Sequence, residues 1–254
     1  MSLGILFSRR WLLTTFIVFV GVGVLTRLGI WQLDRLAQRR AFNQRVVAQL
    51  DGQPINLNLH GLELSLYDNE FRSATVTGTY DYSTQISLRN RVVRNRIGVN
   101  FLTPLLLTES DQVILVDRGW IPADQASPDQ WEQFELADEV QVTGVLRRSE
   151  LIPPLSMRPD PTVMPGQSTV MAWNMVNLDQ IAVQNPDLFT SVYLQEEGAE
   201  IGQKLPYTEP FELEISEGPH QNYAIQWFLF AGMLLIGYPF FVKSQEQSEI
   251  NEVS

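Results

Sequence analysis

The stretch WLLTTFIVFVGVGVL, residues 11–25, decides the fold class, because it is a long apolar run without a charged residue. The run continues past Thr26 and Arg27 to Ile30, so residues 11–30 carry a single charge. A helix of about 20 apolar residues crosses the roughly 30 Å hydrocarbon core of a bilayer. The alternatives are a buried core helix and a cleaved signal peptide, but LGIWQ at 28–32 offers no small-residue cleavage site. Residues 11–30 are therefore predicted to form a transmembrane helix.

A second apolar run, YAIQWFLFAGMLLIGYPFFV, covers residues 223–242 and has no charge. Trp227 lies near its start, Tyr238 lies near its end, and Lys243 follows it directly. Aromatic and basic residues at the ends of an apolar segment are typical of anchors at the membrane interface. A second transmembrane helix is predicted over 223–242, with a buried core helix again as the alternative.

One extramembrane domain, residues 31–222, is predicted between the spans, with a tail at 1–10 and an acidic tail at 243–254. Residues 32–50 have apolar side chains at helical spacing up to Gly52, which predicts that the first helix continues into the aqueous phase. Strands are predicted from alternating or short apolar segments at 71–80, 85–90, 99–107, 112–118, 139–146, 170–176 and 190–194. The resulting class is an α+β membrane protein with a mainly antiparallel β domain, either a sheet or a small barrel.

Two further segments of the domain have their own signals. Asn177 is a good N-cap for a short helix at 177–184 that must end before Pro186. The Pro-rich passage at 151–166 reads as an extended surface loop.

The charges around the first span do not fix its orientation. Arg9 and Arg10 precede it, but four arginines follow it closely: Arg35, Arg39, Arg40 and Arg45. Large domains cross membranes largely regardless of charge, and an Arg-Arg pair before an apolar run resembles a signal anchor. The termini are therefore expected in the cytoplasm, with the domain on the outer face. An Arg- and Ser-rich presequence is missing before Trp11, which favours a bacterial plasma membrane over a mitochondrion.

The composition excludes several classes of site. The chain has no Cys and only two His, so disulfides, Cys-based zinc or copper sites, iron–sulfur clusters, CxxCH haem attachment and a His-rich metal cage are ruled out. A formal net charge of −11 argues against a general nucleic-acid binder. The sequence contains no GxSxG, P-loop or HExxH motif and no distinct carboxylate pair, so no enzymatic activity is predicted.

His220 is the best single candidate for a chemical role. It lies in Gly218-Pro219-His220, directly before the second span, where Gly218 as N-cap and Pro219 at the first helical position make a good helix start. His220 is thereby expected in the first helical turn, where the helix dipole disfavours protonation of imidazole. A neutral imidazole at a membrane boundary can ligate haem iron. The alternative is an interfacial residue without a ligand, and His60 is read as a solvated loop residue.

The arginines raise further possibilities. Arg27 lies within the first apolar stretch, where a charge is costly and suggests a function, although snorkelling to the headgroups also explains it. A second group surrounds a predicted hairpin: Arg89, Arg91, Arg94 and Arg96. These side chains could meet carboxylates such as haem propionates or an acidic partner, or form a solvated strand face or contact lipid headgroups.

A series of short motifs, in order from the end of the first span to the start of the second, carries a resemblance to a known family. They are Leu28-Gly29-Ile30-Trp31-Gln32-Leu33 with Arg35, Phe71-Arg72, Gly78-Thr79-Tyr80-Asp81, Leu88-Arg89-Asn90-Arg91, Gly98 with Thr103-Pro104-Leu105, Val116-Asp117-Arg118-Gly119-Trp120-Ile121-Pro122, Gly144-Val145-Leu146-Arg147, and Gly218-Pro219-His220 with Tyr223-Ala224 and Gln226-Trp227-Phe228. Together, from about Arg9 to Lys243, they resemble the Surfeit-locus family of cytochrome c oxidase assembly proteins. Asp117 stands where that family is expected to have Asn.

The resemblance implies a non-catalytic factor in the assembly of the haem–copper oxidase. It implies a link to haem a and its insertion into oxidase subunit 1, the largest subunit, with His220 as the axial ligand. Trp31, Trp227 and Phe228 would then lie against the macrocycle, and Arg27 or Arg118 would pair with its propionates. Other oxidase assembly factors are further expected partners.

Two other classes of function remain open. One is a membrane-anchored scaffold for oxidase assembly that never holds haem. The other is a membrane-bound enzyme, such as a hydrolase or a haem-modifying oxygenase. A copper chaperone is disfavoured because Cys is absent.

Overall fold

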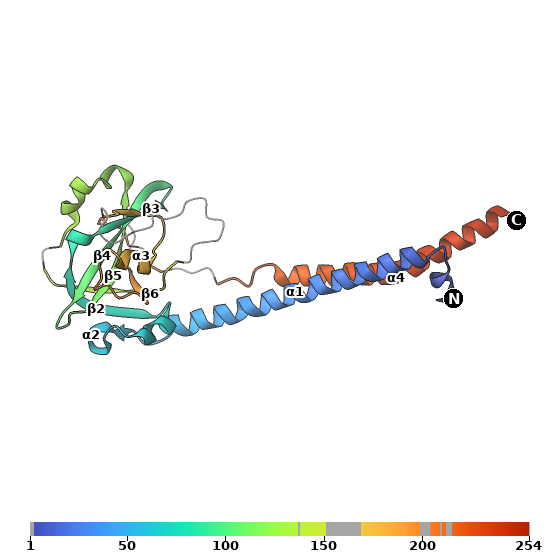
Figure 1. Cartoon of the computed structure of the whole chain (residues 1–254), viewed down its shortest axis with the longest axis horizontal. Helices are drawn as coiled ribbons and strands as arrows, with labels where there is room; N and C mark the ends of the chain where they lie inside the picture. The colour runs from blue at the N-terminus through green and yellow to red at the C-terminus, as the bar shows by residue number, and fades with distance from the viewer. Residues whose placement is uncertain are drawn as a thin grey trace. The chain divides into compact units, whose positions relative to one another are not determined.

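The computed structural model contains two structural units (Figure 1). The helical unit comprises Met1–Arg45 and Glu214–Ser254, and the β unit comprises Val46–Leu213. The structure describes residues 3–136, 138–150, 169–198, 204–208, 210–211 and 215–253. The Pro-rich passage at 151–166, predicted as a surface loop, lies outside these residues.

The helical unit consists of two long helices that run antiparallel along one shared face. They are α1 (Leu12–Leu50) and α4 (His220–Val253), preceded by the short 3-10 helix η1 (Leu3–Phe7). The less exposed positions of each helix recur every three or four residues, which is the spacing of two helices packed along a single face. We call this face the seam. On α1 it comprises Thr15, Val18, Val22, Leu25, Gly29, Gln32 and Leu36, and on α4 it comprises His220, Ala224, Trp227, Ala231, Leu234, Tyr238 and Val242.

Contacts across the seam fix the register of the two helices. The Thr15 hydroxyl lies 2.6 Å from that of Tyr238. Further along, the ring of Phe228 covers Gly29 so closely that a Cβ there would come within 2.7 Å of it. The glycine is therefore needed for this close approach, as small residues are at other membrane-helix interfaces.

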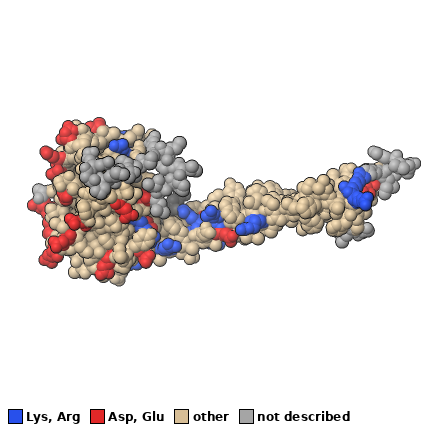
Figure 2. Space-filling view, in the orientation of Figure 1, with Lys and Arg blue, Asp and Glu red and all other residues tan. Residues whose placement is uncertain are grey.

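Helix α1 and the part of α4 over His220–Ser248 each contain an apolar stretch long enough to cross a membrane. Large apolar side chains point outward along both, among them Leu13 at 70% and Ile236 at 63% exposure. The core helix of a water-soluble protein would bury them. Figure 2 shows that the paired helices carry almost no charge along their middle, with basic side chains on either side, whereas acidic side chains are spread over the β unit. The two predicted apolar segments thus both lie in long helices, as expected for an α+β membrane protein with two spans.

The bounds of the helices extend the sequence-based expectation. Residues 32–50 continue α1 without a break, as predicted. Helix α4 starts at His220, three residues before the predicted span, and runs through Pro239 and on past Val242 to Val253. The carbonyl oxygen of Pro219 accepts the first helical hydrogen bond from Tyr223, at 3.1 Å. Pro219 is thus the N-cap rather than Gly218, and His220 lies in the first turn as predicted.

We expect Thr15→Val to weaken the helix pair measurably. The Thr15 hydroxyl donates to the carbonyl oxygen of Leu6 at 2.7 Å and accepts from Tyr238, so valine removes both bonds without changing the shape. Such interhelical bonds in membrane proteins contribute roughly 0.6 kcal/mol and at most about 1.7 kcal/mol. An SDS titration of the detergent-solubilised chain measures the loss in unfolding free energy. Thr14→Val, at an exposed neighbouring position, is the control, and equal effects of the two changes would contradict the assignment.

The β unit is built on one eight-stranded sheet. Its strands are β1 (Ile55–Asn56), β2 (Ser73–Tyr80), β3 (Ile86–Val93), β4 (Arg96–Leu107), β5 (Val113–Pro122), β6 (Val140–Arg147), β7 (Ala172–Trp173) and β8 (Tyr193–Glu196). The order is β1-β2-β6-β8-β5-β4-β3-β7, and an additional pairing joins β2 to β4. That pairing closes β2, β6, β8, β5 and β4 into a ring, so the sheet is barrel-like. The predicted, mainly antiparallel β domain is confirmed.

Strand β4 makes this closure possible because it changes partner along one edge. Its first part pairs with β3, up to Ile86 opposite Leu102, and its last part pairs with β2, from Tyr80 opposite Leu105. Pro104 lies between these two pairings, and its carbonyl oxygen accepts from the Asp81 amide on that same side. A proline lacks the backbone N–H, which costs least where no ladder continues.

Alternation along the strands separates two cores. In β2 the buried positions are Ala74, Val76, Gly78 and Tyr80, as the sequence predicts. The core inside the ring includes Val76, Leu105, Ile114, Val116 and Leu194. The outer face of β5 carries Leu115, which packs in a second core with Trp173 and Ile181. Because both of its faces are covered, the first part of β5, Val113–Val116, is a continuous apolar run.

Short elements cover the rest of the unit. They are the helices α2 (Leu57–His60) and α3 (Leu178–Ala182) and the 3-10 helices η2 (Leu64–Asn69), η3 (Tyr82–Thr84), η4 (Ala123–Gln125) and η5 (Pro128–Phe134). The Asn177 side chain accepts from the Gln180 amide at 3.2 Å, which confirms the predicted N-cap. The predicted strand at 170–176 is reduced to β7, and β1 was not predicted. Strand β1 has only two residues, too few for a periodic signal.

Candidate functional site

The imidazole of His220 is held in the seam by a residue of the other helix. Its Nδ1 lies 2.8 Å from Oε1 of Gln32. An amide oxygen only accepts hydrogen bonds, so Nδ1 must carry the proton and donate it. In the neutral ring Nε2 then keeps its lone pair, and among the described residues it has no hydrogen-bond partner. A ring oriented through one nitrogen, with a lone pair on the other, is the usual form of a histidine that ligates a metal.

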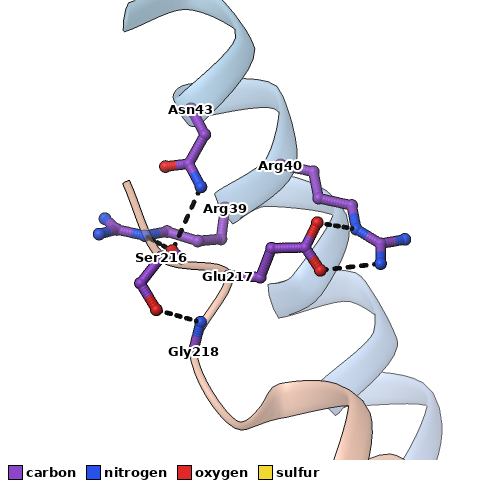
Figure 3. A network of polar contacts seen from close by, with 6 residues as sticks. All are labelled: Arg39, Arg40, Asn43, Ser216, Glu217 and Gly218. Atoms are coloured by element: carbon purple, nitrogen blue, oxygen red, sulfur yellow. Dashed lines mark hydrogen bonds and ion pairs between the residues drawn. The ribbon is translucent and has the colours of Figure 1, made fainter. Parts of the chain in front are cut away.

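The chain that leads into α4 is fixed to α1 by polar contacts (Figure 3). The carbonyl oxygen of Ser216 accepts from Arg39 Nε at 2.9 Å and from Asn43 Nδ2 at 3.2 Å. The Ser216 hydroxyl accepts from the Gly218 amide at 3.1 Å. Gly218 itself has φ +68°, which glycine adopts without strain. These contacts set where the chain turns into α4 and hence where His220 lies.

A bidentate ion pair stands beside this turn (Figure 3). Nε and Nη2 of Arg40 donate to the two carboxylate oxygens of Glu217, both at 2.8 Å. The hydrogen bond from Arg40 lowers the pKa of Glu217, and the same bond raises the pKa of Arg40. Both side chains are about half exposed, and exposed pairs contribute little to stability. The pair instead contributes geometry, because its two hydrogen bonds fix the register of α1 and the start of α4.

The three predicted aromatic residues lie around this part of the helical unit but have their own contacts. Phe228 packs on Gly29, as described above. Trp31 is 44% exposed, with the Arg35 guanidinium 5.6 Å from its ring centre. Trp227 lies in the seam, and its ring meets that of Phe230 edge to face.

Arg27, the predicted intramembrane charge, is exposed on α1. An exposed arginine near the end of a span is consistent with snorkelling toward the headgroups. Its pairing with a propionate stays a prediction.

Arg118 lies in the β unit and is 4% exposed. Its Nη1 donates to Gln85 Oε1 at 3.2 Å and its Nη2 donates to the Phe134 carbonyl oxygen at 2.6 Å. The rings of Tyr80 and Tyr82 flank the guanidinium. Arg118 is therefore a buried guanidinium that already has several neutral partners. Its predicted pairing with a propionate stays a prediction.

The predicted arginine-rich hairpin is confirmed as β3–β4. Its turn residues Arg94 and Asn95 both have positive φ, as the tight turn of a two-residue hairpin requires. Arg89 and Arg96 are exposed, whereas Arg91 lies 3.4 Å from the carboxylate of Glu150. The other histidine, His60, ends helix α2 and is exposed, as expected of a solvated residue.

Sequence reasoning missed Gln32 and Ser216. Gln32 had a usable signal, because it is a polar residue at a seam position otherwise filled by small or apolar side chains. Ser216 gave no signal, since it contributes a backbone carbonyl, which any residue type would supply.

These observations define a two-pass membrane protein with a barrel-containing unit between its spans and an ordered imidazole at the start of the second span. The profile of the SURF1 family matches residues 19–232, which is most of the chain, so the chain belongs to the SURF1 family.

Named relatives agree with this assignment. Surfeit locus protein 1 of Gallus gallus is 28% identical over 138 residues, covering 48% of this chain and 44% of that protein. Its counterpart in Xenopus tropicalis is 25% identical over 150 residues, covering 53% and 48%. An uncharacterized SURF1-like protein of Mycobacterium bovis is 28% identical over 233 residues, covering 89% and 81%. The chain spans about half the length of the two vertebrate relatives.

Proposed function

We propose that this protein is an assembly factor for cytochrome c oxidase that binds haem a and assists its insertion into oxidase subunit 1. Membership of the SURF1 family supports the role in assembly. The observation that supports haem binding is the His220 imidazole, oriented by Gln32 and carrying a lone pair on Nε2 at the end of an apolar helix pair. The protein is not an enzyme in this proposal, and it works in a bacterial plasma membrane with its termini in the cytoplasm.

The chain offers groups suited to both ends of an amphiphilic haem. The haem would supply an iron that takes an axial nitrogen ligand, and His220 would hold it. Trp31, Trp227 and Phe228 would provide aromatic surface for the macrocycle. Arg27 would bind a propionate through charge-assisted hydrogen bonds. A single histidine ligand also suits a carrier that must release its cargo.

The rival function is a scaffold that contacts oxidase subunits and never holds haem. The same structure fits this function, which needs no ligand on Nε2. His220 would then only stabilise the packing of α4 against α1 through its hydrogen bond to Gln32. The enzyme alternative has no specific observation in its favour.

The assembly role is tested by deleting the gene and measuring haem a and oxidase activity in the membranes. We expect both to fall and to return when the wild-type gene is supplied. Normal oxidase in the deletion strain would refute the role in assembly. Two results together would support the scaffold instead. The His220→Ala gene would restore full oxidase activity, and the purified wild-type protein would be colourless.

Gln32→Leu is expected to weaken haem binding by about 10- to 100-fold, the usual range for residues that orient a metal-ligating histidine. Leucine cannot accept the Nδ1 proton, so the ring loses its fixed orientation. Haem titration of the purified apoprotein, followed by absorbance, measures the change. Gln32→Glu keeps an acceptor oxygen and should retain most of the affinity.

Gln44→Leu, an exposed change on the same helix, is the matched control and should bind like wild type. Equal affinities for Gln32→Leu and Gln44→Leu would show that Gln32 does not position the ligand.

A further inference from the structure

The interior of the barrel changes from apolar to polar at one end. Alternate residues of a strand face the same side, so the residue two positions beyond an interior residue is also interior. Three neighbouring strands show the change. Two positions beyond the core residues Leu105 of β4, Val116 of β5 and Leu194 of β8 lie polar residues. These are Thr103, Arg118 and Glu196 respectively. A polar layer inside a barrel is costly unless its groups are satisfied. Such a departure from an apolar core is typical of a functional site.

Arg118 is the charged centre of this layer. Its partners are the amide oxygen of Gln85, the carbonyl oxygen of Phe134 and two tyrosine rings, at 4.6 Å for Tyr80 and 5.1 Å for Tyr82. All of these are neutral. Within the described part of the chain, Arg118 forms no ion pair with a carboxylate, although it is almost fully buried. A buried guanidinium with only neutral partners gains from a nearby anion.

A pocket of about 190 Å³ opens onto this guanidinium. Lys204, Gln133 and Thr208 bring hydrogen-bond donors to its wall, while Leu205 and Leu136 add apolar surface. The mouth of a β-barrel is a common place for ligand sites. The small volume fits a compact group rather than a drug-sized molecule, for which pockets of about 300–1,000 Å³ are usual.

Glu196 is a buried carboxyl group that gains or loses its proton near neutral pH. Burial raises the pKa of its carboxyl group to about 7, Arg118 opposes that rise, and Asp117 adds to it. The Tyr80 hydroxyl lies 3.5 Å from the Glu196 carboxylate, and the titratable residues Lys204 and Glu135 line the same pocket. Near neutral pH the carboxyl group is therefore about half protonated. In the protonated form it removes a negative charge from the pocket and can donate a hydrogen bond to an incoming anion.

We propose that the pocket at the barrel mouth binds the carboxylate of a compact monoanionic acid, with Arg118 and Lys204 as its cations. A monoanion is favoured over a dianion because Glu135 and Glu196 also line the pocket. The carboxylate belongs to a free small acid or to the C-terminus of a peptide. A haem propionate has the same chemistry, but this proposal does not rest on haem binding, since it is tested on protein without haem.

The test is calorimetric titration of the haem-free full-length chain in nanodiscs with sodium propionate, at pH 6 and pH 8. Binding that needs protonated Glu196 should be about tenfold tighter at pH 6, because a group of pKa about 7 is about ten times more protonated there. Lys204→Gln and Arg118→Lys should each weaken binding at pH 6 by about tenfold. Arg96→Gln removes an exposed cation from the same unit and should leave the affinity unchanged.

Glu196→Gln mimics the protonated acid and should bind equally at both pH values, near the wild-type affinity at pH 6. A short peptide with a free C-terminus, compared with its amide, identifies the source. Tighter binding of the free acid peptide than of propionate assigns the site to a chain terminus, and the reverse assigns it to a small acid. No binding of either probe, or affinities unaffected by Lys204→Gln and Arg118→Lys, would overturn the proposal.

Discussion

His220→Ala is expected to abolish the visible haem spectrum of protein purified from cells that make haem a. The His220 imidazole is the proposed axial ligand, and its Nδ1 lies 2.8 Å from Gln32 Oε1, which leaves Nε2 for the iron. Alanine removes the proposed ligand and leaves the apolar surroundings in place. We expect at least about a tenfold fall in haem bound per chain, measured from the Soret absorbance and the pyridine haemochrome. Free imidazole added to the variant should restore part of the spectrum.

His60→Ala is the matched control, because it removes the only other histidine of the chain from an exposed position in the β unit. It should bind haem like wild type. An unfolded His220→Ala protein would be recognised by loss of the β-unit melting transition, so that folding and ligation are scored separately. A Soret band equal to that of wild type in folded His220→Ala would rule out His220 as the ligand.

Trp173→Ala should cause the largest loss of stability. The side chain is fully buried in the outer core with Leu115 and Ile181, and its Nε1 donates to the Val170 carbonyl oxygen at 3.0 Å. Truncation removes the buried ring area, opens a cavity and leaves the Val170 carbonyl oxygen with only the longer hydrogen bond from Gln184 Nε2, at 3.4 Å. Such changes cost about 3–5 kcal/mol, a large part of the roughly 5–15 kcal/mol that stabilises a typical domain.

Denaturant unfolding of the detergent-solubilised chain, followed by near-UV circular dichroism, measures this loss. Trp31→Ala deletes the same side chain from a 44% exposed position of the helical unit and should leave the β-unit transition in place. A shift of less than about 1 kcal/mol for Trp173→Ala would show that the second core does not depend on this ring.

The sequence predicted best those features that depend on local periodicity. Both spans, the continuation of α1 to Leu50, the alternation of β2 and the Asn177 cap follow from spacing along the chain alone. The last three residues of β3, Arg91, Val92 and Val93, lie beyond the strand predicted at 85–90, because they do not alternate between polar and apolar. Their pairing with β4 is imposed by the tight turn and by the neighbouring strand, which a reading of single segments does not include.

The candidate site shows the same division. His220 could be chosen from its place before the second span, but Gln32 is its partner through tertiary packing of residues 188 positions apart. The polar layer of Arg118 and Glu196 was also missed as a unit, since it arises from the ring closure of strands distant in sequence. Asp117 departs from the expected Asn, and the structure explains why it is tolerated: its carboxylate accepts from Asn100 Nδ2 at both oxygens and from the Gly119 amide.

The position of β8 in the ring has a consequence for biosynthesis. β8 pairs with β5 on one side and with β6 on the other, although both of those strands are made earlier. Until Tyr193–Glu196 has emerged from the ribosome, β5 and β6 keep unpaired edges, and such edges recruit other strands. The nascent chain must therefore be protected from aggregation until shortly before the second span is synthesised. A premature stop before residue 193 should give a product that is degraded rather than a smaller folded protein.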